Sequence, residues 1–301
     1  MRDRWVDMSF ISYLINGVSL GSVYAIIALG YTMVYGIAKM LNFAHGDVIM
    51  IGAYIALTVM TGMGLPPAAA VLIAVVFCTV LGMLIERVAY KPLRNASSPL
   101  AVLITAIGVS YLLQNIALLV FGANTKTFTS VVSIPSLTLA GGKLTISGET
   151  MMTIVACIVI MIGLNLFINK SKAGQAMLAV SEDKGAAQLM GINVNGTIAM
   201  TFAIGSALAA IAGVLLCSAY PTLTPYTGAM PGIKAFVAAV FGGIGSIPGA
   251  MVGGILLGII EIFGKAYISS QMADAIVFGV LIIVLLVKPA GIFGKNIQEK
   301  V

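Results

Sequence analysis

The chain has 301 residues, of which 60% are hydrophobic and only 9% are charged, and its mean hydropathy is +1.09. Soluble globular domains carry about 25% charged residues, so this composition excludes them. The net charge of +6 falls in the loops, where it indicates orientation in a membrane and not nucleic-acid binding. We expect an all-α polytopic integral membrane protein with about eight transmembrane helices, in a range of about seven to nine.

The first apolar stretch, residues 8–38, is uncharged, rich in glycine and long for one span. It fits one tilted helix, or a helix followed by a re-entrant half, so the side of the membrane that holds the N-terminus stays open. The residues before it carry two bases and two acids, and no small-residue cleavage site follows a short apolar core. We therefore expect a retained span and not a cleaved signal peptide.

The block NFAHGD, residues 42–47, precedes a predicted helix pair at residues 48–60 and 67–85. A basic cluster follows, and the next span covers residues 100–121. The polar stretch after it, residues 124–150, has β-favouring residues around Gly141–Gly142, which is a hairpin signal. This stretch should lie outside the cell, either as a lip that contacts an external binding protein or as a solvated connector.

Residues 151–168 form the next predicted span and lead into a polar, helix-forming segment, residues 170–196, which we call the polar segment. A further span covers residues 198–219. A proline-rich loop then leads to a glycine-rich hairpin at residues 235–263 and a last span at residues 272–287.

Basic residues gather in three of the connections. Because cytoplasmic loops carry an excess of Lys and Arg, we expect all three connections to be cytoplasmic. The residues are Arg87, Lys91 and Arg94 in the first, Lys170, Lys172 and Lys184 in the polar segment, and Lys288, Lys295 and Lys300 in the tail.

The polar segment has the composition of an amphipathic helix that packs into a groove on a soluble partner. An ordinary interfacial helix is the alternative. The chain has no GxxxxGK[ST] phosphate loop, so any ATP that powers it must bind to another subunit. The predicted apolar or small contacts are Ala176, Met177, Val180, Ala187, Leu189 and Met190, and the predicted solvated residues are Glu182, Asp183 and Lys184.

Small residues recur at four-residue spacing, which lets helix backbones approach closely in lipid. Gly17 and Gly21 form one such pair, and Gly254 and Gly258 form another. The run FGGIGSIPGA, residues 241–250, is different because a proline and four glycines interrupt an apolar stretch. Broken helices at membrane depth occur where they are buried in protein or line a water-filled cavity. We expect this run to form a wall of a translocation path.

Few ionisable residues lie within the spans. Lys234 and Glu261 flank the glycine-rich hairpin, where they pair or lie at the outer interface with their charged ends in water; we favour the second arrangement. The lone His45 has no partners spaced for a metal site, and its turn either meets the path or caps a helix. The three cysteines, all within apolar runs, are predicted packing residues.

Blocks along nearly the whole chain are similar to the branched-chain amino acid ABC importer permease family. The length and the NFAHGD block resemble the LivH-type subunit more than the longer LivM-type subunit. The blocks are residues 21–25, 28–32, 35–36, 42–46, 52–54, 86–87, 190–194, 232–236, 242–250, 274–279 and 288–294.

The resemblance implies a single permease domain over residues 1–301, with a cytoplasmic coupling loop at 170–196 and an external loop at 124–150. It implies two cytoplasmic ATP-binding subunits, a second, LivM-type permease subunit, an external solute-binding protein and a bacterial cytoplasmic membrane. It implies no cofactor in this chain, since the partners bind ATP, and hence no enzyme activity of its own.

The resemblance implies leucine, isoleucine and valine as substrates, with urea or short amides as the alternative. A self-contained secondary transporter or channel is a more distant alternative, and it would need more intramembrane acids than this chain has. An intramembrane serine protease, suggested by His45 and several serines near membrane depth, is equally distant. Since the chain has one histidine, loss of a peptidase activity in His45→Ala would be its signature.

The residues expected to carry function form two groups. For coupling to the ATPases they are Gly174, Ala179, Glu182, Ala186, Ala187 and Gly191. For the translocation path they are Asn42, His45, Gly243, Gly245, Ser246 and Pro248.

Overall fold

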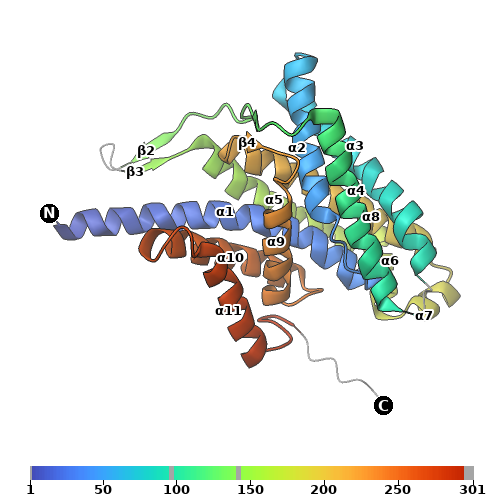
Figure 1. The fold of residues 1–301 in the computed structure, drawn as a ribbon. Coiled ribbons are helices and arrows are strands. Elements are labelled where there is room, and N and C mark those ends of the chain that lie inside the picture. Colours follow the sequence, from blue (N-terminus) through green and yellow to red (C-terminus); the bar gives the residue numbers. More distant parts are fainter. Residues whose placement is uncertain (1, 95–97, 140–143, 295–301) are drawn as a thin grey trace.

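The computed structural model describes residues 2–94, 98–139 and 144–294, and the fold is almost entirely helical (Figure 1). In these residues seven helices are long and apolar enough to cross a membrane, and two shorter apolar helices accompany them. The all-α polytopic class is therefore confirmed. The long helices are α1 (Arg2–Ala38), α2 (His45–Gly62), α3 (Pro67–Ile85), α4 (Pro99–Phe121), α5 (Gly148–Lys170), α8 (Val194–Ala219) and α10 (Ile247–Tyr267); the short ones are α9 (Ala229–Gly242) and α11 (Ala273–Val287).

Helix α1 is one continuous helix of 37 residues, so the first span has no re-entrant half. It lies at the centre of the fold and packs most extensively against α10 and α8. The predicted helix pair is confirmed as α2 and α3. Helix α3 continues as a π-helical turn, Glu86–Tyr90, and a 3-10 turn, Lys91–Leu93.

The glycine pairs predicted from their spacing meet each other across the contact between α1 and α10. A Cβ built on Gly21 would lie 2.6 Å from the Cα of Ile255, and one built on Gly17 would lie 2.9 Å from the Cα of Ile259. On α10, a Cβ on Gly254 would lie 2.5 Å from the Cα of Ala25. A side chain at these positions would collide with the facing helix, so the approach requires glycine. Helix association in lipid depends on such close packing.

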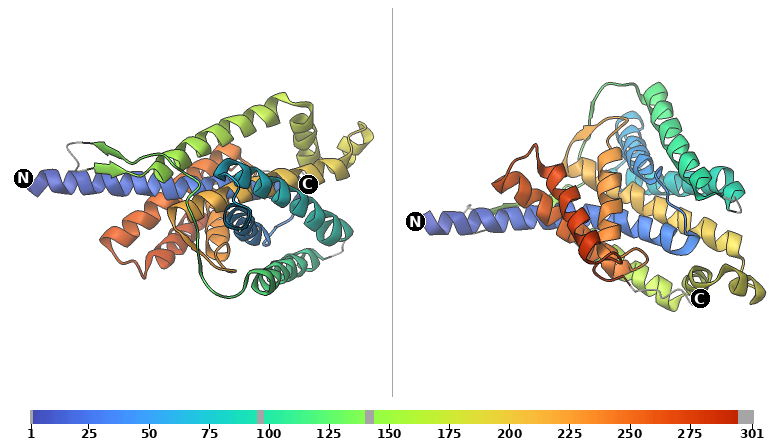
Figure 2. Two further views of the ribbon diagram at one scale, coloured as in Figure 1. Left: turned by 90° about the horizontal axis from the view of Figure 1, so that it is seen from above. Right: turned by 60° about the horizontal axis from the view of Figure 1, so that its bottom comes forward.

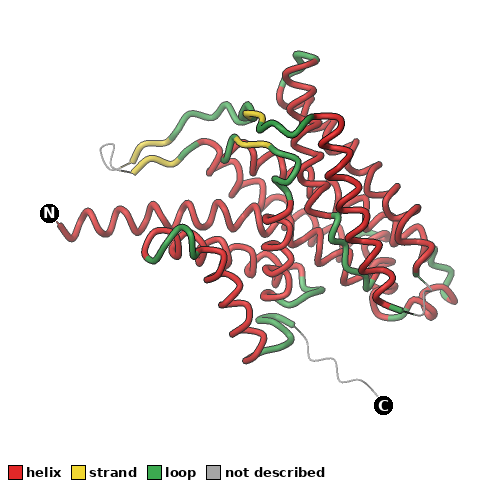
Figure 3. Tube along the Cα trace, in the orientation of Figure 1, coloured by secondary structure: helices red, strands yellow, loops and turns green. Residues whose placement is uncertain are grey.

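Short strands join the connections outside the helices (Figure 3). Strand β2 (Leu137–Leu139) pairs antiparallel with β3 (Leu144–Ile146), which confirms the hairpin signal, although its expected turn at Gly141–Gly142 lies outside the described residues. Strand β1 (Lys126–Thr127) pairs with β4 (Thr222–Leu223). The second pairing, which was not predicted, holds the stretch after α4 against the loop after α8.

The two ends of the molecule differ in character. The N-terminal end of α1 and the β2–β3 hairpin lie at one end, and the short helices α6 (Lys172–Glu182) and α7 (Lys184–Leu189) lie at the other (Figures 1 and 2). Burial lowers the pKa of the Lys184 ammonium, and the nearby charges of Arg94 and Lys39 lower it further. Lys39, Arg94 and Lys184, from the connections after α1, after α3 and after α5, therefore gather at the α6–α7 end.

An excess of positive charge at the α6–α7 end is the pattern expected of a cytoplasmic side. Two of the tail lysines, Lys295 and Lys300, lie outside the described residues. The cysteines Cys78, Cys157 and Cys217 are buried and free, as expected for packing residues.

Candidate functional site

The polar segment folds as two short helices and not as one amphipathic helix. The break falls at Asp183, which ends α6 and caps α7, with its backbone extended and its Oδ1 accepting a hydrogen bond from the N–H of Ala186 at 2.9 Å. Asp is a strong N-cap because its carboxylate satisfies a free N–H of the first turn. The expectation of a single helix missed this capping preference.

A sharp corner joins α5 to α6. The Oγ of Ser171 accepts a hydrogen bond from the N–H of Gly174 at 2.9 Å and so starts α6. Gly174 is buried, and a Cβ at this position would overlap the backbone of Phe167 and Ile168. Gly174 therefore serves the corner from inside the protein and is not available at the surface.

The other expected coupling residues divide between an inner and an outer face. Met177, Val180 and Ala187 are buried, and Ala179 is half-buried. The side chains of Leu189 and Met190 are 89% and 82% exposed. The solvent-exposed face of the two helices, which we call the docking face, consists of Leu178, Glu182, Ala186, Leu189, Met190 and Gly191.

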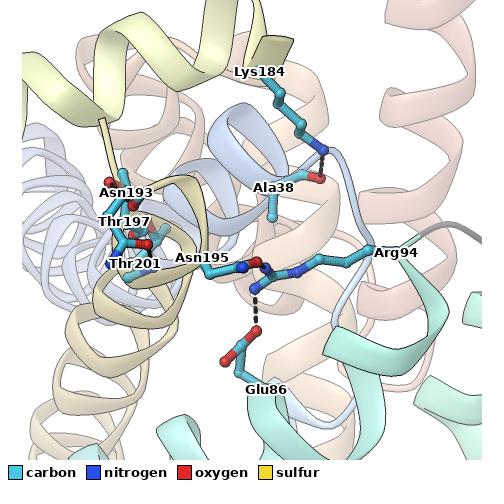
Figure 4. A network of polar contacts seen from close by, with 9 residues as sticks. Ala38, Glu86, Arg94, Lys184, Asn193, Asn195, Thr197 and Thr201 are labelled. Atoms are coloured by element: carbon cyan, nitrogen blue, oxygen red, sulfur yellow. Dashed lines mark hydrogen bonds and ion pairs between the residues drawn. The ribbon is translucent and has the colours of Figure 1, made fainter. Parts of the chain in front are cut away.

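The sequence suggested that Lys184 only faces solvent, but the structure gives it a second contact. Its Nζ donates a hydrogen bond to the carbonyl oxygen of Ala38, at the end of α1, over 2.9 Å (Figure 4). The last carbonyls of a helix have no partner within the helix, and a cation there also favours the helix dipole. This contact ties α7 to the end of the central helix.

Arg94 forms a second link beside the polar segment. Its guanidinium donates to Oε1 of the buried Glu86 and to Oδ1 of Asn195, in the first turn of α8 (Figure 4). The Oδ1 of Asn193 caps α8 by accepting from the N–H of Gly196 at 2.9 Å. The end of α3 and the start of α8 are thereby held together. Sequence reasoning missed this link, although a carboxylate at the end of an apolar run required a nearby cation.

The expected interruption of the glycine-rich hairpin is present between α9 and α10. Gly243 and Gly245 have φ angles of 103° and 94°, which side chains with a Cβ rarely adopt. The Oγ of Ser246 then caps α10 by accepting from the N–H of Gly249 at 3.2 Å, and Pro248 stands in the first turn of α10. Proline is tolerated there because the N–H it lacks would have no partner in the helix.

The segment after α11 covers the end of α9. The N–H of Ile292 donates to the carbonyl oxygen of Phe241 at 2.9 Å, and the N–H of Phe293 donates to that of Gly242 at 3.0 Å. A chain break between two helices in lipid is costly unless its polar groups find partners in the protein. The tail backbone therefore satisfies carbonyls that the interruption exposes.

The α9–α10 turn lies at the C-terminal end of α1. A Cβ on Gly36 would lie 3.3 Å from the Cα of Gly245, and Ile244 and Asn42 line one small cavity of about 10 Å³. The buried Asn42 accepts a hydrogen bond at Oδ1 from the hydroxyl of Tyr90 at 3.0 Å. Two of the expected path elements, Asn42 and the turn, are thus brought together.

His45 does not line that cavity, although it contacts Tyr31, which does. It is the first residue of α2, it is buried, and its ring meets Tyr31 edge to face with centroids 4.6 Å apart. Its Nε2 has no hydrogen-bond partner among the described residues and lies against Gly30. The N-cap residue of α2, Ala44, makes no side-chain hydrogen bond, so the turn before α2 does not cap the helix through a side chain.

The expectation that Lys234 and Glu261 keep their charged ends in water is wrong. Both are buried, and Nζ of Lys234 lies 2.8 Å from Oε1 of Glu261 and 2.6 Å from Oδ1 of Asp274. Glu261 also pairs with Lys265 at 2.6 Å and accepts from the hydroxyl of Tyr24 at 2.8 Å. Two cations and two anions thus neutralise one another where α1, α9, α10 and α11 meet.

Comparison with known proteins assigns the chain to a family. The profile described as branched-chain amino acid transport system / permease component matches residues 13–286. The high-affinity branched-chain amino acid transport system permease protein LivH of Escherichia coli is 46% identical over 302 residues, which cover 97% of this chain and 98% of that protein. The chain belongs to the branched-chain amino acid ABC permease family, and it is of the LivH type.

Other relatives agree with this assignment. The corresponding permease BraD of Pseudomonas aeruginosa is 45% identical over 304 residues, covering 97% of this chain and 98% of that protein. A solved structure, PsaBC from Streptococcus pneumoniae in complex with Fab, matches with a TM-score of 0.51 at 14% identity, covering 96% of this chain and 97% of that one. At this identity the match shows a shared fold alone.

The LivH-type permease is accordingly a multi-pass inner-membrane protein and the permease subunit of a branched-chain amino acid ABC importer. Within the described parts of the permease, no group of three or more His, Cys, Asp and Glu residues is placed to hold a metal ion. The polar contacts around α6, α7 and the α9–α10 turn are therefore the features to be explained in terms of transport.

Proposed function

We propose that this permease moves leucine, isoleucine and valine inward as half of a translocation path, driven by ATP that partner subunits hydrolyse. The near full-length match to LivH and BraD carries this proposal. The partners are two cytoplasmic ATP-binding subunits, a second permease subunit of the LivM type and an external solute-binding protein. The chain binds no cofactor and performs no covalent chemistry, and it has no phosphate loop of its own.

The docking face is the surface proposed for the ATP-binding subunits. Leu189 and Met190 are large apolar residues on the water-facing cytoplasmic end, where lipid tails do not cover them. Helical segments that dock in grooves use such apolar anchors beside small residues, and Ala186 and Gly191 supply the small residues here. Ala187 and Gly174 support the two helices from inside.

A continuous set of contacts supports the transmission of force. Lys184 of α7 holds the carbonyl of Ala38, and two residues earlier Gly36 lies against Gly245 of the α9–α10 turn. A displacement of α6 and α7 by the ATPases would therefore act on the end of α1 and on this turn together. In the proposed cycle that movement opens the path to one side and then to the other.

The proposed path runs beside the turn. Asn42 and the turn residues Gly243, Gly245, Ser246 and Pro248 are the proposed lining, because irregular backbone at membrane depth is tolerated where it borders a cavity or is buried in protein. His45, with its ring against α1, is proposed to position α2 beside this lining. On the outside, residues 124–150 are proposed to receive the binding protein, and Leu137 and Leu139 of β2 are exposed there.

The test replaces the two apolar anchors of the docking face. In Leu189→Asp/Met190→Asp, the ATP-binding subunits should no longer co-purify, and leucine uptake into proteoliposomes should fall at least about tenfold, because each buried anchor contributes roughly 1.5–3 kcal/mol. The double variant Leu189→Ala/Leu178→Ala, which shortens two apolar side chains without adding charge, should give a smaller loss of binding and uptake. The matched control is Ile134→Asp, an exposed apolar residue in residues 124–150.

The control should keep the ATP-binding subunits bound. Full uptake by the anchor variant, or uptake by the permease with no ATP-binding subunit present, would overturn the proposal. Uptake of urea or a short amide in place of leucine would replace the substrate and leave the coupling intact.

A further inference from the structure

A large cavity opens at the outer end of the permease, away from the α9–α10 turn. Its volume is about 640 Å³, and it lies between α1, the start of α5, the end of α10 and the residues that follow α8. Cavities that hold small molecules in proteins measure about 300–1,000 Å³, so this one has the size of a ligand site. It faces the side from which an imported solute arrives.

Two opposite charges line this cavity from different helices. Lys265 stands in the last turn of α10 and Glu149 in the first turn of α5. The side chain of Lys265 is 39% exposed, and Glu261 takes one of the three donors of its ammonium. Glu261 holds Lys265 from the buried side, and among the described residues the ammonium has no second hydrogen-bond partner.

Between the charges the wall is both polar and aliphatic. Asn16 and the buried Ser19 provide polar groups from α1, and Leu20 and Ile262 provide aliphatic surface. A zwitterionic amino acid that enters a membrane protein loses hydration, which costs free energy. This cost is offset only when both its carboxylate and its ammonium are paired. A lysine and a glutamate from two different helices that line this cavity supply one partner for each group.

We propose that this cavity is the outer entry site of the permease for a zwitterionic amino acid with an aliphatic side chain. Lys265 Nζ binds the α-carboxylate, Glu149 binds the α-ammonium, and the side chain lies against Leu20 and Ile262. This inference rests on the proposed transport of amino acids. The headgroup of phosphatidylethanolamine carries the same pair of charges, so the test separates the two sources.

The test uses the complete transporter in vesicles of phosphatidylglycerol, with a leucine analogue that carries a diazirine in its side chain. After illumination, mass spectrometry should find the adduct in residues 13–23 and 262–266. Excess leucine should suppress the adduct, whereas leucinol, which lacks the carboxylate, should not. Lys265→Met and Glu149→Gln should each reduce labelling about tenfold, because each removes a charge-assisted hydrogen bond, and Lys265→Arg should keep most of it.

The matched control is Gln271→Met, which changes an exposed polar residue between α10 and α11 that does not line the cavity. Its labelling should equal that of the unchanged permease. Assembly with the ATP-binding subunits and ATP hydrolysis show whether each variant is folded.

Three outcomes would overturn the inference. They are adducts found only outside residues 13–23 and 262–266, an adduct that leucine does not suppress, and loss of labelling when phosphatidylethanolamine is added to the vesicles, which assigns the cavity to lipid. Leucine uptake is measured in the same vesicles. Uptake without labelling of the cavity rejects the entry site alone, and absence of uptake rejects the proposed function itself.

Discussion

The ammonium of Lys184 lies 2.9 Å from the carbonyl oxygen of Ala38, although the two residues are 146 positions apart in the chain. The contact joins the short helix α7 to the end of the longest helix. It acts beside the direct packing of α6 against α1, and it makes Lys184 the first residue to change.

Lys184→Met should uncouple ATP hydrolysis from uptake. The variant keeps an aliphatic side chain of similar length but loses the hydrogen bond to Ala38, which we expect to contribute about 1 kcal/mol. Uptake per ATP hydrolysed should fall about fivefold while the complex still assembles. Both rates are measured in proteoliposomes. Lys172→Met, an exposed lysine in α6, is the control, and an equal fall in both variants would contradict the role of the Ala38 contact.

Arg94→Met should destabilise the permease more than the double change Arg94→Met/Glu86→Met. Removing Arg94 alone leaves the buried carboxylate of Glu86 without its cation, which costs about 3 kcal/mol or more. Removing both charges avoids that cost. Thermal unfolding in detergent measures the order, and a double variant less stable than Arg94→Met would count against the pair as drawn.

The charge cluster around Glu261 should respond unequally to removal of its two acids. Glu261→Gln removes the buried anion that Lys234 and Lys265 share and leaves the buried Lys234 only the half-exposed Asp274, so we expect a loss of about 3 kcal/mol. Asp274→Asn should cost less than about 1 kcal/mol, since the side chain of Asp274 is 50% exposed. Thermal melting points of the two variants give the comparison, and equal losses would mean that burial does not set the cost.

Gly254→Ala should destabilise the contact between α1 and α10, because its new methyl group would overlap the backbone of Ala25. Gly108→Ala and Gly279→Ala meet nothing within 4 Å and serve as controls. Alanine is favoured over glycine within a helix by about 1 kcal/mol, so the controls should be equally or more stable than the unchanged permease. Thermal unfolding measures all three. A Gly254→Ala variant as stable as the controls would show that the helices can separate at no cost.

The features that the sequence predicted correctly are those encoded over short distances. The apolar runs predicted the spans, Gly254 and Gly258 predicted a close helix contact, and Pro248 predicted the interruption of the glycine-rich hairpin. Each rests on a local rule about lipid, packing or backbone geometry. The roles expected of Asn42 and Glu182 stay predictions, because their structural positions do not measure transport.

The features that were missed depend on partners far along the chain. Arg94 and Asn195 are 101 positions apart, and the pairing of β1 with β4 joins segments of different spans. Hydropathy also says where a charge such as Lys234 lies along a span but not toward which neighbour it points. The direction of a side chain within the bundle follows from helix packing, which a single sequence leaves undetermined.

The backbone that closes the end of α9 comes from Ile292 and Phe293, so it emerges from the ribosome after every helix that the structure describes. A chain that stops at Val287 would contain all the described spans but leave the carbonyls of Phe241 and Gly242 without these partners. Maturation of this corner must therefore wait until the segment after α11 has been synthesised. An affinity tag or reporter is for this reason better attached beyond Gly294 than inserted between Val287 and Ile292.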